Sequence, residues 1–212
     1  MKRALTTLYI VRHGESDGNV RHILQGQINS SKLTENGKKQ ARTLGKKLSQ
    51  IPFAAVFSSD LTRAKQTAQL IALERKLAVT TTKALRERNY GEFEGRPYRH
   101  YEEELKDLLA QYQTLTKEAV FTQDLGHGIE LPQNMIARVF TFLREVAVGY
   151  RGKNILMVTH GSLMRYLLIH LGYATHHELP IGAVGNTAYI KLASDGVDFF
   201  IQEVAGVKKM IG

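Results

Sequence analysis

The chain has 212 residues, of which 43% are hydrophobic and 23% are charged, and it contains no cysteine. This composition is typical of a globular protein with a sizeable core, and it excludes disulfide bonds and thiolate metal sites. The formal net charge of +9 favours an anionic partner, although a basic solvated surface would give the same value. No aromatic residues alternate with the basic cluster at 38–47, so we expect no nucleic-acid partner.

We predict one domain covering residues 1–212, because no linker, repeat or low-complexity tract divides the chain. The first residues, "MKRALTTLYIVRHG", begin with basic side chains as a signal peptide does. Their apolar part is short and ends in Arg12-His13, so a strand is favoured over an export signal. No apolar run approaches the length of a membrane span. We therefore expect a cytoplasmic protein with no membrane partner.

Strands and helices alternate in the first 82 residues. Thr34 is a predicted helix cap, because helically spaced apolar residues follow it. The predicted order is a strand at 5–11, a helix at 34–51, a strand at 53–59, a helix at 60–76 and a strand at 77–82.

The second half begins with an irregular segment at 84–98, which glycine and proline interrupt. A polar helix at 98–115 is predicted to start an excursion from the main layer at about 98–131. Pro132 is predicted to open a long helix that ends near Gly149. A strand at 154–159, a helix at 162–172 and two closing strands joined at Asp195-Gly196 complete the pattern.

This alternation predicts an α/β fold, a three-layer α/β/α arrangement with a mostly parallel central sheet. Ligands of such sheets bind beyond the carboxyl ends of the strands. Two of these strand ends carry a histidine followed by a glycine, at His13 and His160. Arg12 precedes the first histidine, and Arg63 lies in the first turn of the second helix. Guanidinium groups suit the oxygens of a phosphoryl group, so we expect a phosphate site at this edge.

A neutral imidazole can attack phosphorus when cationic groups neutralise the phosphoryl oxygens. The leaving oxygen then needs a proton, and Glu87 in "LRERNYGEFEG" is the best candidate for the general acid. Glu92 and Glu94 are nearby alternatives. A plain exposed charge cluster around Arg86 and Arg88 would explain the same segment without catalysis. Similarly, Arg63 could pair with Asp60 on a helix surface instead of binding phosphate.

Taken together, these motifs resemble the histidine phosphatase superfamily, in the branch of cofactor-dependent phosphoglycerate mutases and related phosphatases. The matching pieces occur in family order: "VRHGES", "LQGQ", "LTENGKKQA", "FSSDLTRAKQTA", "LRERNYGEFEG" and "VTHGSLMR". The resemblance implies that His13 becomes phosphohistidine and that Glu87 donates the proton. It implies a phosphate pocket of Arg12, Arg63 and His160, with further substrate contacts from Asn19, Gln25, Gly26, Gly161 and Ser162. It implies no metal and no organic cofactor.

The excursion at 98–131 bears on the choice between a phosphatase and a mutase. Mutases of this kind carry an adjacent arginine pair there, whereas this segment has few cations and many carboxylates. Such an acidic lid should disfavour a doubly phosphorylated ligand. We therefore expect a phosphomonoester hydrolase acting on a small phosphorylated metabolite. The alternatives are a phosphoglycerate mutase and a catalytically inactive phosphate-binding or regulatory module. The sequence is also compatible with a homodimer, formed through the excursion or the closing hairpin.

Overall fold

The structure is a computed structural model that describes residues 4–210. Its centre is one six-stranded sheet with the order β3-β2-β4-β1-β5-β6. The strands are β1 (Thr6–Arg12), β2 (Phe53–Ser59), β3 (Val79–Thr82), β4 (Asn154–Thr159), β5 (Val184–Ser194) and β6 (Phe199–Val207). The first four strands pair in parallel, and β5 and β6 pair antiparallel. The mostly parallel sheet predicted from the sequence is confirmed.

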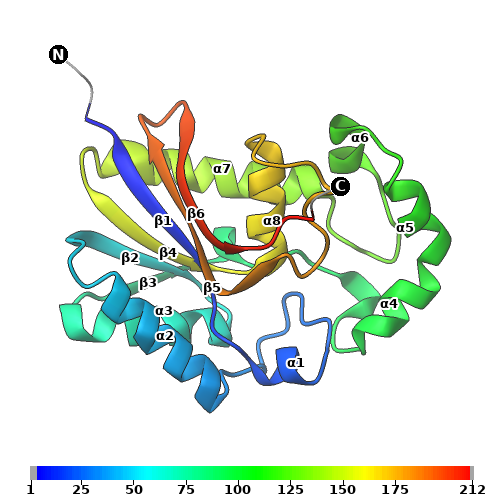
Figure 1. Cartoon of the computed structure of the whole chain (residues 1–212), viewed down its shortest axis with the longest axis horizontal. Helices are drawn as coiled ribbons and strands as arrows, with labels where there is room; N and C mark the ends of the chain where they lie inside the picture. Colours follow the sequence, from blue (N-terminus) through cyan, green and yellow to red (C-terminus); the bar gives the residue numbers. More distant parts are fainter. Residues whose placement is uncertain (1–3, 211–212) are drawn as a thin grey trace.

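Helices cover both faces of this sheet (Figure 1). The helices are α1 (Asp17–Val20), α2 (Glu35–Lys47), α3 (Thr62–Ala72), α4 (Tyr98–Glu104), α5 (Lys106–Tyr112), α6 (Lys117–Thr122), α7 (Pro132–Gly149) and α8 (Gly161–His170). Short 3₁₀ turns lie at Leu73–Arg75, Lys83–Leu85 and Gly91–Phe93. The helix starts follow local chemistry, since the Thr34 hydroxyl accepts a hydrogen bond from the Gly37 N–H at 3.0 Å and Pro132 occupies the start of α7.

Alternate residues of β1 enter two separate cores. Leu8 and Ile10 pack in the core that α7 and α8 cover. Tyr9 and Val11 pack in the core under α2 and α3. Because successive strand side chains point to opposite faces, this buried strand has a nearly continuous apolar sequence. The three-layer arrangement is therefore confirmed.

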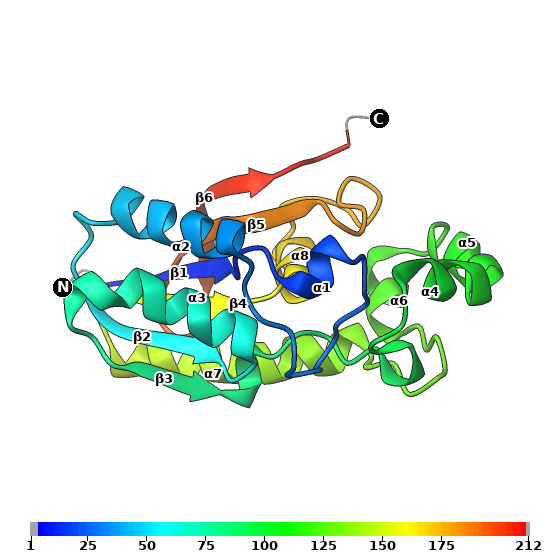
Figure 2. The same cartoon turned by 90° about the horizontal axis from the view of Figure 1, so that it is seen from below.

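The segment 98–131, called the lid below, differs from the single helix predicted at 98–115. It forms three short helices, α4, α5 and α6, at one end of the molecule beyond the ends of the parallel strands (Figure 2). The break between α4 and α5 lies at Leu105, whose backbone leaves the helical region (φ −104°, ψ 16°). The side chain of Leu105 is buried where the two short helices meet.

The strand register brings two distant chain segments together. Arg12 at the end of β1 lies opposite Thr159 at the end of β4, and the His13 N–H donates to the Thr159 carbonyl at 2.9 Å. The residues that follow these strands therefore leave the sheet side by side. Within residues 4–210, no helix combines the length and apolar character that crossing a bilayer requires.

Candidate active site

The paired strand ends place two histidines in contact. The rings of His13 and His160 lie edge to face with their centroids 5.2 Å apart, and both side chains are buried. Burial is the main cause that holds the pKa of each ring well below its usual range, and the nearby Arg63 is the next. Both imidazoles are therefore neutral at physiological pH in the free protein.

The hydrogen bonds of His13 define its tautomer. Its Nδ1 lies 2.7 Å from the Gly14 carbonyl oxygen, and because a carbonyl only accepts, Nδ1 carries the hydrogen. Nε2 then has a lone pair, toward which the Arg63 Nε points at 3.3 Å. This ring is oriented as a nucleophile, with a guanidinium group at the attacking atom.

Two buried arginines supply positive charge around that atom. Arg63 is 1% exposed and donates to the carbonyls of Ile28 at 3.0 Å and Gly26 at 2.7 Å. Burial lowers the pKa of Arg63 to about 10, so it remains a cation at neutral pH. Arg12 donates to the Val184 carbonyl, and its Nε makes no hydrogen bond within the described residues.

The surface ion pair considered for Arg63 from the sequence is wrong. Asp60 instead bonds Arg86 through two contacts of 2.7 and 2.6 Å. Arg63 therefore faces the site rather than the solvent, and its guanidinium remains close to His13.

Glycine is required at two positions of this pocket. A Cβ at Gly161 would lie 3.2 Å from the Arg12 Nε, so glycine lets the guanidinium pass over the start of α8. Gly26 has a φ of +47°, and a Cβ there would lie 2.0 Å from the Glu94 Oε1. A side chain at Gly161 would push against the Arg12 guanidinium group, and one at Gly26 would collide with the Glu94 side chain on a backbone at positive φ.

Glu87 reaches the same pocket from an irregular loop. Its Oε1 accepts from the backbone N–H groups of Arg88 at 2.9 Å and Leu163 at 3.0 Å, and its Oε2 accepts from Ser162 at 3.0 Å. The amino end of α8 thus holds the carboxyl group. Of the three candidates for the acid, only Glu87 lines the pocket.

Asn19 belongs to a second network on the pocket wall. Its Oδ1 accepts from the Ser16 N–H and hydroxyl at 3.0 Å each and from the Asn186 Nδ2 at 3.3 Å. These bonds assign the amide orientation and leave Nδ2 for a ligand. Gln25 joins the network because its Oε1 also lies 3.0 Å from the Ser16 hydroxyl, whose single hydrogen is shared between the two amide oxygens. The sequence analysis assigned no role to Asn186, which also donates to the His13 carbonyl at 3.1 Å.

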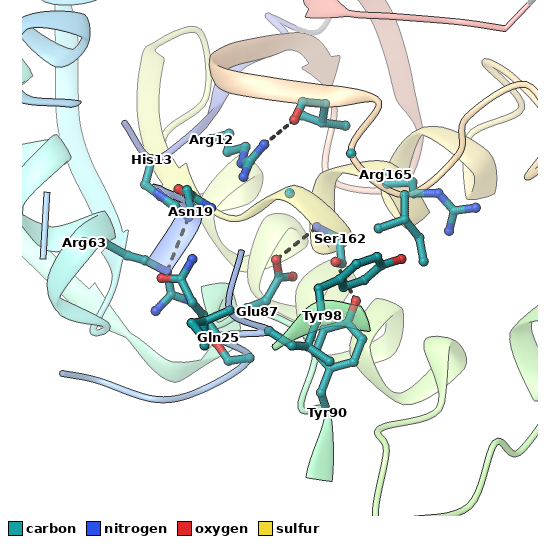
Figure 3. Close-up of a pocket in the computed structure, with 17 residues that line it drawn as sticks. Arg12, His13, Asn19, Gln25, Arg63, Glu87, Tyr90, Tyr98, Ser162 and Arg165 are labelled. Carbon is teal, nitrogen blue, oxygen red and sulfur yellow. Dashed lines mark hydrogen bonds between the residues drawn. The ribbon is translucent and has the colours of Figure 1, made fainter. Parts of the chain in front are cut away.

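The pocket is a cavity of about 170 Å³. Figure 3 shows Arg12, His13 and Arg63 on one side and Arg165 on the other, with Glu87 and Ser162 between them. All the predicted site residues line it except His160. The His160 ring is 0% exposed and lies behind His13, with no hydrogen bond to either ring nitrogen within residues 4–210.

Eight further residues line the pocket that were not predicted from the sequence, and three of them have polar side chains: Tyr90, Tyr98 and Arg165. Arg165 follows Ser162 by one helical turn, so helical spacing in "HGSLMR" could have placed both on one face. A second cavity, about 480 Å³ in volume, adjoins the pocket and is called the outer cavity below. It shares these three residues with the pocket and extends under the lid to Tyr101, Tyr112 and Leu109. Across the described part of the chain, no group of His, Asp and Glu side chains is arranged to hold a metal.

Comparison with known proteins agrees with this geometry. The family described as "Histidine phosphatase superfamily (branch 1)" matches residues 8–205. Phosphoglycerate mutase-like protein 4 of Arabidopsis thaliana is 33% identical over 162 residues, which are 76% of this chain and 68% of that protein. Fructose-2,6-bisphosphatase TIGAR of Xenopus tropicalis is 49% identical over 94 residues, which are 42% of this chain and only 34% of that protein. The crystal structure of phosphoglycerate mutase from Bacillus anthracis superposes with a TM-score of 0.81 at 25% identity, covering 97% of this chain and 94% of that one.

Proposed function

Because the chain belongs to branch 1 of the histidine phosphatase superfamily, we propose that it hydrolyses phosphomonoesters of small metabolites through a phosphohistidine at His13. The observation that carries this proposal is the orientation of His13. Its Nδ1 is bound to a carbonyl, so its Nε2 lone pair faces a pocket whose lining includes Arg12, Arg63 and the Glu87 carboxyl group.

In the first half of the reaction, His13 Nε2 attacks phosphorus. The N–P bond forms as the bond from phosphorus to the leaving oxygen breaks, and protonated Glu87 gives its proton to that oxygen. Arg12 and Arg63 hold the phosphoryl oxygens, whose negative charge would otherwise repel the nucleophile. Burial keeps His13 neutral before substrate binds, so no proton has to leave the ring before attack.

In the second half, water attacks the phosphohistidine. Glu87, now a carboxylate, takes a proton from the water as the oxygen–phosphorus bond forms and the N–P bond breaks. Inorganic phosphate leaves, and both His13 and Glu87 return to their starting protonation states. The same carboxyl group therefore serves as acid and then as base.

The outer cavity supports a leaving group that carries anionic or hydroxyl groups. Two arginines line it, Arg88 at 2% and Arg165 at 6% exposure, and neither forms an ion pair within the described residues. Most lid carboxylates are exposed, and Glu102 is the acidic residue among those that line the cavity. The acidic side chains of the lid thus lie mostly on its outer surface. They give no reason to exclude a doubly phosphorylated ligand from the cavity.

We therefore rank phosphorylated sugars first among the substrates, including bisphosphates. The name of the Xenopus tropicalis relative, a fructose-2,6-bisphosphatase, points to the same class. Phosphoglycerate isomerisation is the second candidate, because the two other relatives reported above carry the mutase name and the same pocket could return a phosphoryl group to a sugar acid.

The test combines a substrate panel with trapping of the intermediate. Purified protein in excess chelator is assayed with sugar mono- and bisphosphates, phosphoserine and phosphoglycerates, and mutase activity is followed with 2,3-bisphosphoglycerate. We expect phosphate release and an alkali-stable, acid-labile phosphoryl label on the protein. His13→Ala should abolish the label, whereas His177→Ala, at an exposed histidine, should keep it. Isomerisation faster than hydrolysis would favour the mutase, and bound phosphate without turnover would favour the inactive module.

The cytoplasmic location, the lack of nucleic-acid and membrane partners and the homodimer expected from the sequence stay predictions that accompany this proposal. Sedimentation of the purified protein with and without substrate tests the homodimer directly.

A further inference from the structure

The loop that carries Glu87 has no regular backbone of its own. It runs between the 3₁₀ turns at Lys83–Leu85 and Gly91–Phe93, so its position must come from contacts with other parts of the chain. General acid catalysis demands that the carboxyl group stay within hydrogen-bonding distance of the leaving oxygen. The contacts that hold this loop therefore decide whether the proton can be delivered.

One side chain from α7 contacts the loop both before the acid and at the acid itself. Arg138 donates through Nη1 to the Ala84 carbonyl at 2.7 Å and through Nη2 to the Glu87 carbonyl at 3.0 Å. A guanidinium fork can bind two carbonyls at once in a fixed geometry. Because Arg138 lies in the first half of an 18-residue helix, the fork connects the loop to a rigid element.

Glu130 keeps that fork in place and holds the other end of the loop. Its two carboxylate oxygens accept from Arg138 Nε at 2.9 Å and Nη2 at 3.1 Å. Its Oε2 also accepts from the Asn89 N–H at 3.1 Å, and its backbone carbonyl accepts from Arg88 Nε at 2.7 Å. The ion pair thus contacts the chain before, at and after Glu87.

We propose that Arg138 and Glu130 are positioning residues that hold Glu87 at the leaving oxygen, a role that rests on the proposed function of Glu87 as the general acid. Neither of them lines the pocket, and both reach it only through the loop that carries Glu87. Their effect on catalysis acts through the backbone of residues 84–89, whereas the α8 amides bind only the carboxylate of Glu87. Thr159 Oγ1 and Gln27 Nε2 add one bond each, to the carbonyls of Leu85 and Glu87.

The dependence of the rate on the leaving group separates this role from a purely structural one. An aryl phosphate releases a stable phenolate and needs little help from an acid, whereas an alkyl phosphate releases an alkoxide that needs the proton. A displaced acid therefore lowers kcat/KM for the alkyl ester far more than for the aryl ester. A general loss of folded protein lowers both values by the same factor.

The experiment measures kcat/KM for p-nitrophenyl phosphate and for glycerol 2-phosphate in Arg138→Met, Glu130→Gln and Glu87→Gln. We expect Arg138→Met to reduce the alkyl value by roughly 30-fold and the aryl value by less than about threefold. Arg144→Met is the matched control, because Arg144 lies on the same helix, is exposed and has its guanidinium over Phe140. Its kcat/KM values for the two esters should both equal those of the unmodified protein.

A double variant shows whether Arg138 acts through Glu87. If it does, adding Arg138→Met to Glu87→Gln should not increase the alkyl-to-aryl discrimination further, because the acid is already lost. Additive effects would overturn the positioning role. Should Arg138→Met not fold, Arg138→Lys keeps the charge without the fork and is expected to show a smaller change of the same sign.

Different results would contradict the role of Glu87 and the role of Arg138 and Glu130. If Glu87→Gln leaves the alkyl-to-aryl ratio unchanged, Glu87 is not the general acid and the proposed mechanism is wrong. If Glu87→Gln changes the ratio but Arg138→Met and Glu130→Gln do not, the mechanism stands and the positioning role is wrong.

Discussion

The catalytic pocket and the lid are held in place by different forces. In the pocket, charged and polar side chains are bound by backbone groups at the ends of strands and at the start of α8, as Arg63 and Glu87 show. The lid is attached mainly by buried apolar and aromatic side chains, such as Tyr101, Leu105 and Phe121. The Tyr112 hydroxyl, which contacts the Tyr166 hydroxyl at 2.8 Å, is one polar tie between the lid and the core.

This difference separates the chemistry from the choice of substrate. The nucleophile proposed at His13 follows β1, and the cations lie at strand ends and at the start of α3, so the transfer step needs no contribution from the lid helices α4, α5 and α6. In the proposed reaction, the leaving part of the substrate occupies the outer cavity under the lid. Changes in the pocket should therefore affect every substrate, whereas changes under the lid should affect only substrates that fill the outer cavity.

The largest effect is expected from Arg63→Met. Removing the guanidinium that faces both His13 and the phosphoryl oxygens should lower kcat/KM by roughly 10²–10³-fold. The loss should be similar for p-nitrophenyl phosphate and for sugar phosphates, because all of them present the same group to the pocket. Steady-state kinetics on both substrates check this. A loss confined to the sugar phosphates would show that a pocket residue also selects the substrate.

A more selective effect is expected from Arg165→Lys, which keeps the charge but loses the planar fork at the border of the two cavities. For a sugar bisphosphate that the protein hydrolyses, KM should rise roughly tenfold. For p-nitrophenyl phosphate, kcat/KM should change by less than about threefold. Equal losses on both substrates would place Arg165 in the transfer chemistry rather than in substrate choice.

The pH dependence sharpens the description of the pocket. Burial and the arginines lower the pKa of His13 and His160 in the folded protein, so below pH 6.5 the unfolded chain binds more protons than the folded one. The free energy of unfolding should therefore fall with decreasing pH, by up to about 1.4 kcal/mol per pH unit for each histidine. Urea unfolding at pH 7, 6 and 5 measures this. His160→Gln should show a weaker dependence, and an unchanged slope would contradict the burial argument.

The smallest effect is expected from Tyr112→Phe, which removes a hydroxyl that also donates to the Val120 carbonyl at 3.0 Å. The stability cost should be about 1 kcal/mol, seen as a lower urea midpoint. Hydrolysis of p-nitrophenyl phosphate should stay within about threefold of the unmodified protein. A large loss on this small substrate would show that the transfer step does depend on the lid.

The sequence alone predicted the architecture, and it indicated which charged and polar groups follow the strand ends. Buried apolar runs and helix caps are local features, so the strand at 154–159, the cap at Thr34 and the start at Pro132 were correct. The family and the fold expected from the motifs are confirmed by the comparisons. The stretch 98–115 was predicted as one polar helix, whereas the structure divides it at Leu105, where the backbone leaves the helical region.

What the residues determined by themselves was which chemical groups follow each strand, since strand, turn and helix starts depend on neighbouring side chains and backbone preferences. Only the tertiary structure decided which of those groups meet. Ser162 donates to Glu87 although the two residues are 75 positions apart in the sequence. Arg138 donates to the Ala84 carbonyl from 54 positions away. His160 lies behind His13 instead of lining the pocket. These contacts depend on how α7, α8 and the lid pack on the sheet, and no short-range pattern in the chain carries that information.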